Sequence, residues 1–238
     1  MAITDCYTLL GSWPHAEADL SVEALAAGMQ ARGVTRSLVT HASAIFYDAP
    51  QGNELLENLC RQYEPLTPVA VINPLVYPGC VEEIARRLEA GTRIFRFCPQ
   101  EHGYPFSAAV GPLRESLRRL ETAALLLVDL SGIPAPAIDC GLADLLPVPT
   151  AVTVDSRGLG VVAHAASLSN NLWVETSHLL AGGSVEAAVQ HVGASRMIFG
   201  SGAPLRSLGS AVMSVQYAEL ADADRAAIFE GNVQRLLA

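Results

Sequence analysis

The chain has 238 residues and a formal net charge of −9, because 15 arginines and no lysine oppose 24 acidic residues. This balance argues against a nucleic-acid-binding or anionic-membrane surface. The absence of lysine removes Schiff-base catalysis, a Walker-type phosphate lysine and a carbamylated-lysine metal bridge. Half of the residues are apolar, so the chain can bury a large core as one α/β barrel or two small domains.

Five scattered cysteines, with no Cys-x-x-Cys pair, indicate reduced thiols in a cytoplasmic protein. They are Cys6, Cys60, Cys80, Cys98 and Cys140. The N-terminus lacks a basic region followed by an apolar stretch, and no apolar run reaches ~18 residues. We therefore expect no signal peptide and no membrane span.

Short apolar runs alternate with segments rich in Ala, Leu, Glu and Arg along the whole chain. In chain order, the pattern predicts strand Ile3–Leu9, helix Ser21–Arg32, strand Ser37–Ala42, helix Gly52–Tyr63, strand Thr67–Asn73, helix Val81–Ala90, strand Arg93–Cys98, helix Pro112–Thr122, strand Ala124–Leu130, helix Ile138–Leu146, strand Thr150–Asp155, helix Leu159–Ser167, strand Leu172–Thr176, helix Val185–Val192, strand Arg196–Gly200 and helix Asp222–Leu237. Most strands are continuously apolar, as expected where both faces are buried. Eight such repeats predict a single-domain (β/α)8 TIM barrel over residues 1–238.

Three segments carry motifs in a characteristic order. The first strand reads ITDCYTLLG, the segment Asn170–Ser177 reads NNLWVETS, and the last strand reads RMIFGSGAP before a helix that ends in GNVQRLL. Together they resemble the amidohydrolase-related family of metal-dependent hydrolases and decarboxylases. The resemblance covers most of the chain and implies a pocket at the carboxyl ends of the barrel strands.

The chain departs from this family at the positions that resemble its metal ligands. The family usually has Asp-x-His-x-His in the first strand, where Asp5 matches but Tyr7 and Leu9 replace the histidines. It also has an aspartate after Phe-Gly-Ser in the last strand, where this chain has Gly202. Imidazoles and carboxylates are the usual zinc ligands. We therefore expect no family-type zinc site.

Four acidic residues follow or end predicted strands, namely Asp5, Asp129, Asp155 and Glu175. Crowded carboxylates repel, and one is then expected to hold a proton. The alternatives are pairing with Arg96 and Arg157 or binding a hard cation such as Mg²⁺ or Ca²⁺. A further alternative is that these acids accept hydrogen bonds from loop amides and helix N-termini at the barrel mouth.

Proton transfer and anion binding have a few candidate residues. His41 ends a predicted strand and is the best general-base candidate, with Asp129, Asp155 and Glu175 as the acids beside it. For substrate binding we predict Asp5, Tyr7, Arg96, His178 and Ser201, with Arg96 as the clamp for a carboxylate. No two histidines have a metal-ligand spacing.

Two functions remain open from the sequence. The first is a hydrolase, lactonase or decarboxylase relative acting on a small carboxylated or cyclic substrate. The second is a non-catalytic barrel that binds a small ligand or a protein partner, which the replaced ligand positions favour. A homo-oligomer is compatible with either function.

Overall fold

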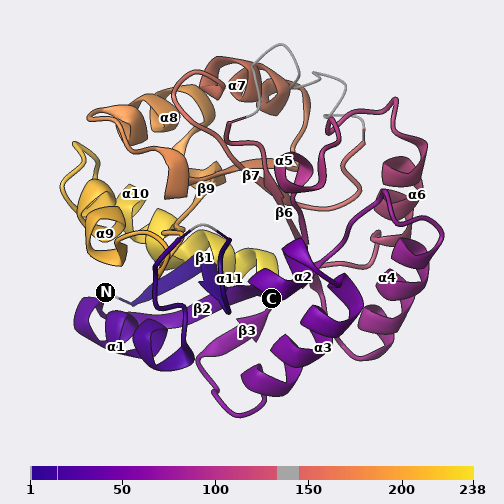
Figure 1. Ribbon diagram of the computed structural model, residues 1–238. Helices are drawn as coiled ribbons and strands as arrows, with labels where there is room; N and C mark the ends of the chain where they lie inside the picture. The colour runs from indigo at the N-terminus through magenta and orange to yellow at the C-terminus, as the bar shows by residue number, and fades with distance from the viewer. Residues whose placement is uncertain (1, 15, 133–144) are drawn as a thin grey trace.

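The computed structural model describes residues 2–14, 16–132 and 145–238 and shows a ring of parallel strands surrounded by helices (Figure 1). The strands are β1 (Ile3–Leu10), β2 (Val34–His41), β3 (Leu66–Pro68), β4 (Ala70–Val71), β5 (Ile94–Phe97), β6 (Leu125–Asp129), β7 (Thr150–Thr153), β8 (Leu172–Glu175) and β9 (Met197–Ile198). Every strand pairs in parallel with the next one, from β1 to β3 and from β4 to β9.

The ring is continuous across the two places where these pairings stop. Between β3 and β4, the amide of Val69 donates to the carbonyl of Val39 at 2.8 Å. Between β9 and β1, the amide of Cys6 donates to the Phe199 carbonyl at 2.8 Å and that of Gly202 to the Tyr7 carbonyl at 2.7 Å. The predicted TIM barrel is confirmed; the predicted third strand, Thr67–Asn73, is divided into β3 and β4.

Helices cover the outside of the ring. They are α1 (Val22–Arg32), α2 (Ala42–Phe46), α3 (Ala49–Cys60), α4 (Gly79–Glu89), α5 (Pro99–His102), α6 (Gly111–Arg119), α7 (Leu159–Leu168), α8 (Ser184–Val192), α9 (Leu208–Gln216), α10 (Asp222–Ala226) and α11 (Asn232–Leu237). The helix predicted at Ile138–Leu146 lies mostly outside the described residues. No helix in the described ranges is long and apolar enough to span a membrane.

Three helices were not predicted from the sequence, namely α2, α5 and α9. The first two are single turns that follow β2 and β5 directly, too short for a periodic apolar pattern. Helix α9 lies in a stretch that reads as a glycine-rich turn, but the hydroxyl of Ser207 accepts from the amide of Ser210 at 3.3 Å and begins a helix there. The Leu208 and Val215 side chains of α9 are buried.

The barrel interior is filled by apolar side chains from most parts of the ring, including two from β6 and Val69 between β3 and β4. This cluster contains Cys6, Leu38, Val69, Ile94, Leu125, Leu127, Ala151 and Ile198, with Val233 of α11. Helix α11 lies behind the strands in Figure 1 and covers their amino-terminal end. Simple alternation would turn Cys6 outward. Cys6 lies inside instead, and β1 has an irregularity between Asp5 and Thr8 that adds one residue against β2.

Candidate active site at the barrel mouth

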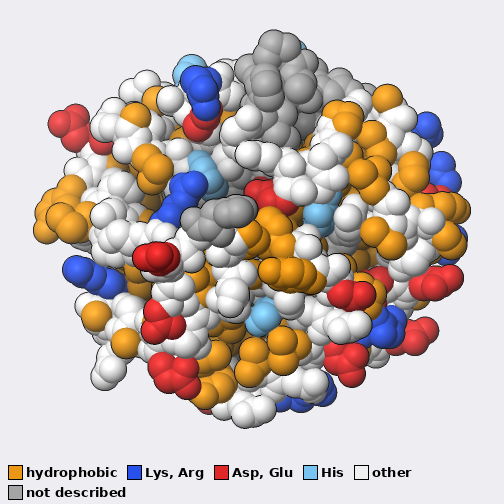
Figure 2. Space-filling model, in the orientation of Figure 1, with side chains coloured by type: hydrophobic (Ala, Val, Ile, Leu, Met, Phe, Trp, Pro, Cys, Tyr) orange, Lys and Arg blue, Asp and Glu red, His pale blue; other side chains and the backbone are white. Residues whose placement is uncertain are grey.

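A cavity of about 300 Å³ lies at the carboxyl ends of the strands, and three of its lining residues carry most of its chemistry: Asp129 at the end of β6, His178 after β8 and Arg206 before α9. Tyr7, Asp155 and Glu101 also line it, together with Leu9, Trp13 and Leu205. Figure 2 shows basic, acidic and histidine side chains between apolar ones at the centre of this face. This position is where TIM-barrel enzymes keep their reactive groups.

Asp129 is the centre of a buried polar cluster at the floor of the cavity. The Tyr7 hydroxyl donates to Asp129 Oδ2 at 3.2 Å, the Cys98 thiol lies 3.7 Å from the same atom, and Arg96 Nη1 lies 3.6 Å away. Asp129 Oδ1 has no hydrogen-bond partner among the described residues. Burial raises the pKa of Asp129, and the positive charge of Arg96 opposes that rise.

Arg96 lies beneath this cluster and is almost completely buried. Its guanidinium stacks on the Tyr7 ring, 3.8 Å from the ring centre, and its Nη2 donates to the carbonyl of Cys6 at 3.3 Å. Its Nε and Nη1 find no hydrogen-bond partner in the described part of the chain. Arg96 thus supplies a fixed positive charge below Tyr7 and Asp129.

A hydrogen-bonded chain connects a buried acid to the cavity on the opposite wall. The Ser177 hydroxyl donates to Glu175 Oε2 at 2.7 Å and lies 2.9 Å from His178 Nδ1. Burial raises the pKa of Glu175 to about 8. Burial, together with the positive charges of Arg206 and Arg96, lowers the pKa of His178 to about 4. At neutral pH, therefore, the imidazole is uncharged and Glu175 holds a proton most of the time.

Asp5 joins the first strand, β1, to the segment that follows the last strand, β9, by hydrogen bonds. Its Oδ2 accepts from the Ser201 hydroxyl at 2.5 Å, and its Oδ1 accepts from the amides of Ser201 at 3.0 Å and Tyr7 at 3.1 Å. Burial raises the pKa of Asp5 to about 7, although these hydrogen bonds oppose the rise. The geometry gives Asp5 and Ser201 a role in joining β1 to the segment after β9.

The positions that resemble family metal ligands have other neighbours here. Tyr7 donates to Asp129, Leu9 packs in an apolar cluster with Ile45 and Val71, and a Cβ placed on Gly202 would lie 3.0 Å from Arg206 Cδ. Gly202 also has φ +73°, which side-chain-bearing residues rarely adopt. Among the described residues, no three His, Cys, Asp or Glu side chains converge on a common point suited to a metal ion.

The predicted site residues divide into three groups. Tyr7, Asp129, Asp155 and His178 line the cavity, whereas Asp5, Arg96, Glu175 and Ser201 are buried next to it or below it. His41 is not among the lining residues, because its Nδ1 accepts from the amide of Ser43 at 3.2 Å and begins α2. The predicted acid–arginine pairs are confirmed for Asp155 with Arg157 at 2.6 Å and for Asp129 with Arg96.

Arg206 was missed from the sequence. It lies four residues beyond Gly202 in the loop before α9, and its amide donates to the Gly202 carbonyl at 2.9 Å. Its Nη1 donates to the Ser177 carbonyl at 3.3 Å, and it makes no ion pair within the described residues. The sequence signal was a single arginine in the loop after the last strand, where barrel enzymes often bind anions.

Comparison with known proteins identifies the family. The family model described as amidohydrolase matches residues 7–238, so the chain belongs to the amidohydrolase family. No match was found among curated proteins.

Solved structures share the fold at low sequence identity. A TIM-barrel protein from Bordetella bronchiseptica has a TM-score of 0.78 at 17% identity, covering 100% of this chain and 98% of that one. A 2,6-dihydroxybenzoate decarboxylase from Rhizobium has 0.75 at 15% identity, covering 99% and 98%. A zinc-bound amidohydrolase from Burkholderia multivorans has 0.76 at 16% identity, covering 99% of each chain.

Gly200 is required by the close approach of Glu175. A Cβ at residue 200 would lie 1.9 Å from Glu175 Oε1, inside a fully packed wall. We expect Gly200→Ala to lower the free energy of unfolding by ~1–3 kcal/mol. The matched control is Gly160→Ala in α7, where a Cβ meets nothing within 4 Å, and a gain of ~0.4–1 kcal/mol is expected. Urea unfolding of both variants checks this; equal effects would contradict it.

The raised pKa values of Asp5 and Glu175 predict a pH-dependent stability. Each acid binds its proton more tightly in the folded chain than in the unfolded one, where its pKa is near 4. The stability that they contribute is complete below pH 4 and is lost as the pH rises through about 7 for Asp5 and about 8 for Glu175.

Glu175→Gln tests the second of these groups, because glutamine imitates the protonated acid. We expect the variant to gain stability relative to the wild type between pH 5 and pH 9, measured by urea unfolding at both values. A difference between the two proteins that does not change with pH would contradict the assignment.

Proposed function

We propose that the chain is a lyase that removes a carboxyl group from a small aromatic carboxylate bound in the mouth cavity. The observation that carries this proposal is the buried carboxyl of Asp129, whose Oδ1 is unpartnered at the floor of the cavity. The 2,6-dihydroxybenzoate decarboxylase that shares this fold supports the same class of reaction.

Arg206 is the residue that we propose binds the substrate's negative charge. It lines the cavity, and the only hydrogen-bond acceptor of its guanidinium among the described residues is the carbonyl of Ser177. A guanidinium that lacks a carboxylate partner presents its remaining N–H donors to an anion. Arg96, which the sequence suggested for this role, is separated from the cavity by the Tyr7 ring and acts from below by its charge.

The chemistry favours protonation over the activation of water. Hydrolysis without a metal needs a base near neutrality, but the pKa of His178 is lowered to about 4. Burial of Asp129, by contrast, raises its pKa and so favours its protonated form, although the positive charge of Arg96 opposes the rise. In the proposed step, Asp129 gives its proton to the ring carbon, the bond from that carbon to the carboxyl carbon breaks, and CO₂ leaves. Water then returns a proton to Asp129, and the hydroxide that remains combines with the released CO₂ to give bicarbonate.

The proposed reaction does not use the metal of the family. Arg96 and Arg206 place positive charge where a cation would lie, and the side chains at positions 7, 9 and 202 are a phenol bonded to Asp129, a buried leucine and a glycine. These groups do not fit a divalent ion, which needs neutral imidazoles or several carboxylates free to bind it.

Release of CO₂ from a panel of hydroxybenzoates by chelator-treated protein tests the proposal. We expect release from at least one of them, at a rate unchanged by added Mn²⁺ or Zn²⁺. Release that depends on the added metal would overturn the metal-free step. Binding of these compounds without any release would support the non-catalytic ligand-binding barrel instead.

We also propose a cytoplasmic location for this activity, because Cys6, Cys60, Cys80 and Cys98 are all buried free thiols. The expected partner is a small-molecule substrate, and a homo-oligomer is compatible with this function.

A further inference from the structure

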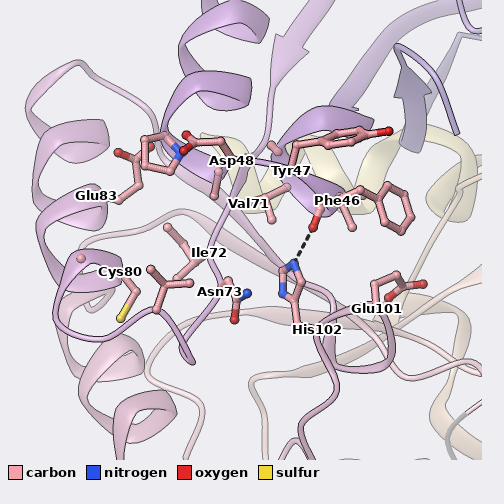
Figure 3. A pocket seen from close by; sticks show the side chains of 16 residues that line it. Phe46, Tyr47, Asp48, Val71, Ile72, Asn73, Cys80, Glu83, Glu101 and His102 are labelled. Carbon is pink, nitrogen blue, oxygen red and sulfur yellow. Dashed lines mark hydrogen bonds between the residues drawn. The ribbon is translucent and has the colours of Figure 1, made fainter. Parts of the chain in front are cut away.

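A second and larger cavity, of about 440 Å³, lies beside the mouth between α2, α5 and the segment that connects β4 to α4 (Figure 3). It shares only Glu101 with the mouth cavity. Its walls are largely apolar and include Ile45, Phe46, Val71 and Ile72. A concave apolar space of this volume with a few polar groups is typical of a small-molecule site.

The polar group that defines the ligand is His102. Its Nε2 lies 3.0 Å from the carbonyl of Ile45, an atom that only accepts, so Nε2 carries the hydrogen. Burial lowers the pKa of the imidazole, which keeps the ring neutral. The buried Nδ1 is then a lone-pair acceptor, and it has no partner in the described part of the chain. In Figure 3 the ring stands at the cavity wall between Asn73 and Glu101.

The charges around this cavity decide between ligand classes. Three carboxylates line it, those of Asp48, Glu83 and Glu101, and no arginine does. Glu83 is neutralised by Arg86 and Arg87, which leaves Asp48 and Glu101 without an ion pair among the described residues. The resulting negative potential repels anions and attracts cations.

The rim of the cavity is apolar and exposed. The Val76 side chain is 61% exposed and that of Tyr47 is 77% exposed, and both line the opening. Large apolar side chains exposed together around a concavity mark a surface that a ligand covers. The Tyr47 and Phe46 rings can also face a bound cation.

From these observations we propose that this cavity is a second ligand site, selective for a small apolar amine whose ammonium group donates to His102 Nδ1 in the negative potential of Asp48 and Glu101. The apolar part of the amine packs against Ile45, Val71 and Ile72. This site is separate from the proposed decarboxylation and does not depend on it.

Four probes of nearly equal size test the proposed selectivity: benzylamine, benzyl alcohol, toluene and benzoate. We expect benzylamine to bind at least about tenfold more tightly than toluene, a difference of ~1.4 kcal/mol, with benzyl alcohol between them. Benzoate, which we expect in the mouth cavity, should not displace benzylamine from this one, so benzylamine is also titrated in the presence of benzoate. Calorimetric titration at pH 7 with the full chain measures the order. Equal affinities for benzylamine and toluene would overturn the proposal.

Two rim variants locate the binding. Val76→Arg places a positive charge at the opening and should weaken benzylamine at least about tenfold. Leu75→Arg is the matched control, because Leu75 is 52% exposed and does not line the cavity; its affinity should stay at the wild-type value. Equal losses in both variants would overturn the location. We expect Arg206→Ala to bind benzylamine with wild-type affinity. This variant therefore distinguishes failure of this site from failure of the mouth site.

Discussion

Arg96→Ala is expected to lower the free energy of unfolding by ~3–5 kcal/mol, because it removes a large, completely buried side chain and leaves a cavity beneath the Tyr7 ring. The guanidinium also supports the Tyr7 ring at 3.8 Å and binds the carbonyl of Cys6, so its packing is lost together with its charge. Urea or thermal unfolding measures the effect directly.

Arg157→Ala is the matched control for this loss. Arg157 pairs with Asp155 at 2.6 Å, but its side chain is 82% exposed, so removing it should cost no more than ~1 kcal/mol. If Arg96→Ala were as stable as Arg157→Ala and lost its affinity for benzoate, Arg96 would be the ligand clamp that the sequence suggested. That result would also mean that the mouth cavity extends below the Tyr7 ring as far as Arg96.

Asp129→Asn is expected to reduce turnover by about 10²–10⁴-fold, the usual contribution of a proton-transfer group. The amide has the same shape as the carboxyl, and its oxygen can still accept from the Tyr7 hydroxyl. The fold should therefore persist, and the rate of CO₂ release measures the loss.

Asp155→Asn controls for a change of charge in the same cavity. Asp155 lines the mouth but is held by Arg157 and by the amides of Arg157 and Gly158. Its substitution should change turnover by no more than about tenfold, which is ~1.4 kcal/mol of activation free energy. Equal losses for both variants would mean that the cavity needs negative charge and that Asp129 has no special role as proton donor.

The fold could be predicted from the sequence because most strands are marked by short, continuously apolar runs. Apolar runs such as 125–128 and 172–174 form strands that are buried on both faces or nearly so, and such runs are typical of parallel strands in a closed barrel. Helices α2 and α5 were not accessible, because a single turn after a strand has no period to detect. The third strand is divided at Val69, whose amide donates to the carbonyl of Val39. This pairing depends on how the ring of strands closes, which the local sequence does not encode.

The site could be predicted from the sequence only in part, because its contacts also depend on how distant segments meet. The sequence places Tyr7, Asp129 and His178 near strand ends, and strand ends meet at the mouth. It does not show that Cys6 lies in the barrel interior, nor that Asp5 and Glu175 accept hydrogen bonds from the hydroxyls of Ser201 and Ser177. Arg206 reaches the cavity because the chain turns back after Gly202, and this reversal has no signature beyond one glycine and one proline.

Titration of benzoate into chelator-treated wild-type protein and Arg206→Ala tests the central claim, that the mouth cavity binds an aromatic carboxylate without a metal. We predict that the wild type binds benzoate with no metal present and that Arg206→Ala weakens this binding at least about tenfold, or ~1.4 kcal/mol. Binding that appears only after a divalent metal is added, or that is equally strong in Arg206→Ala, would contradict the account.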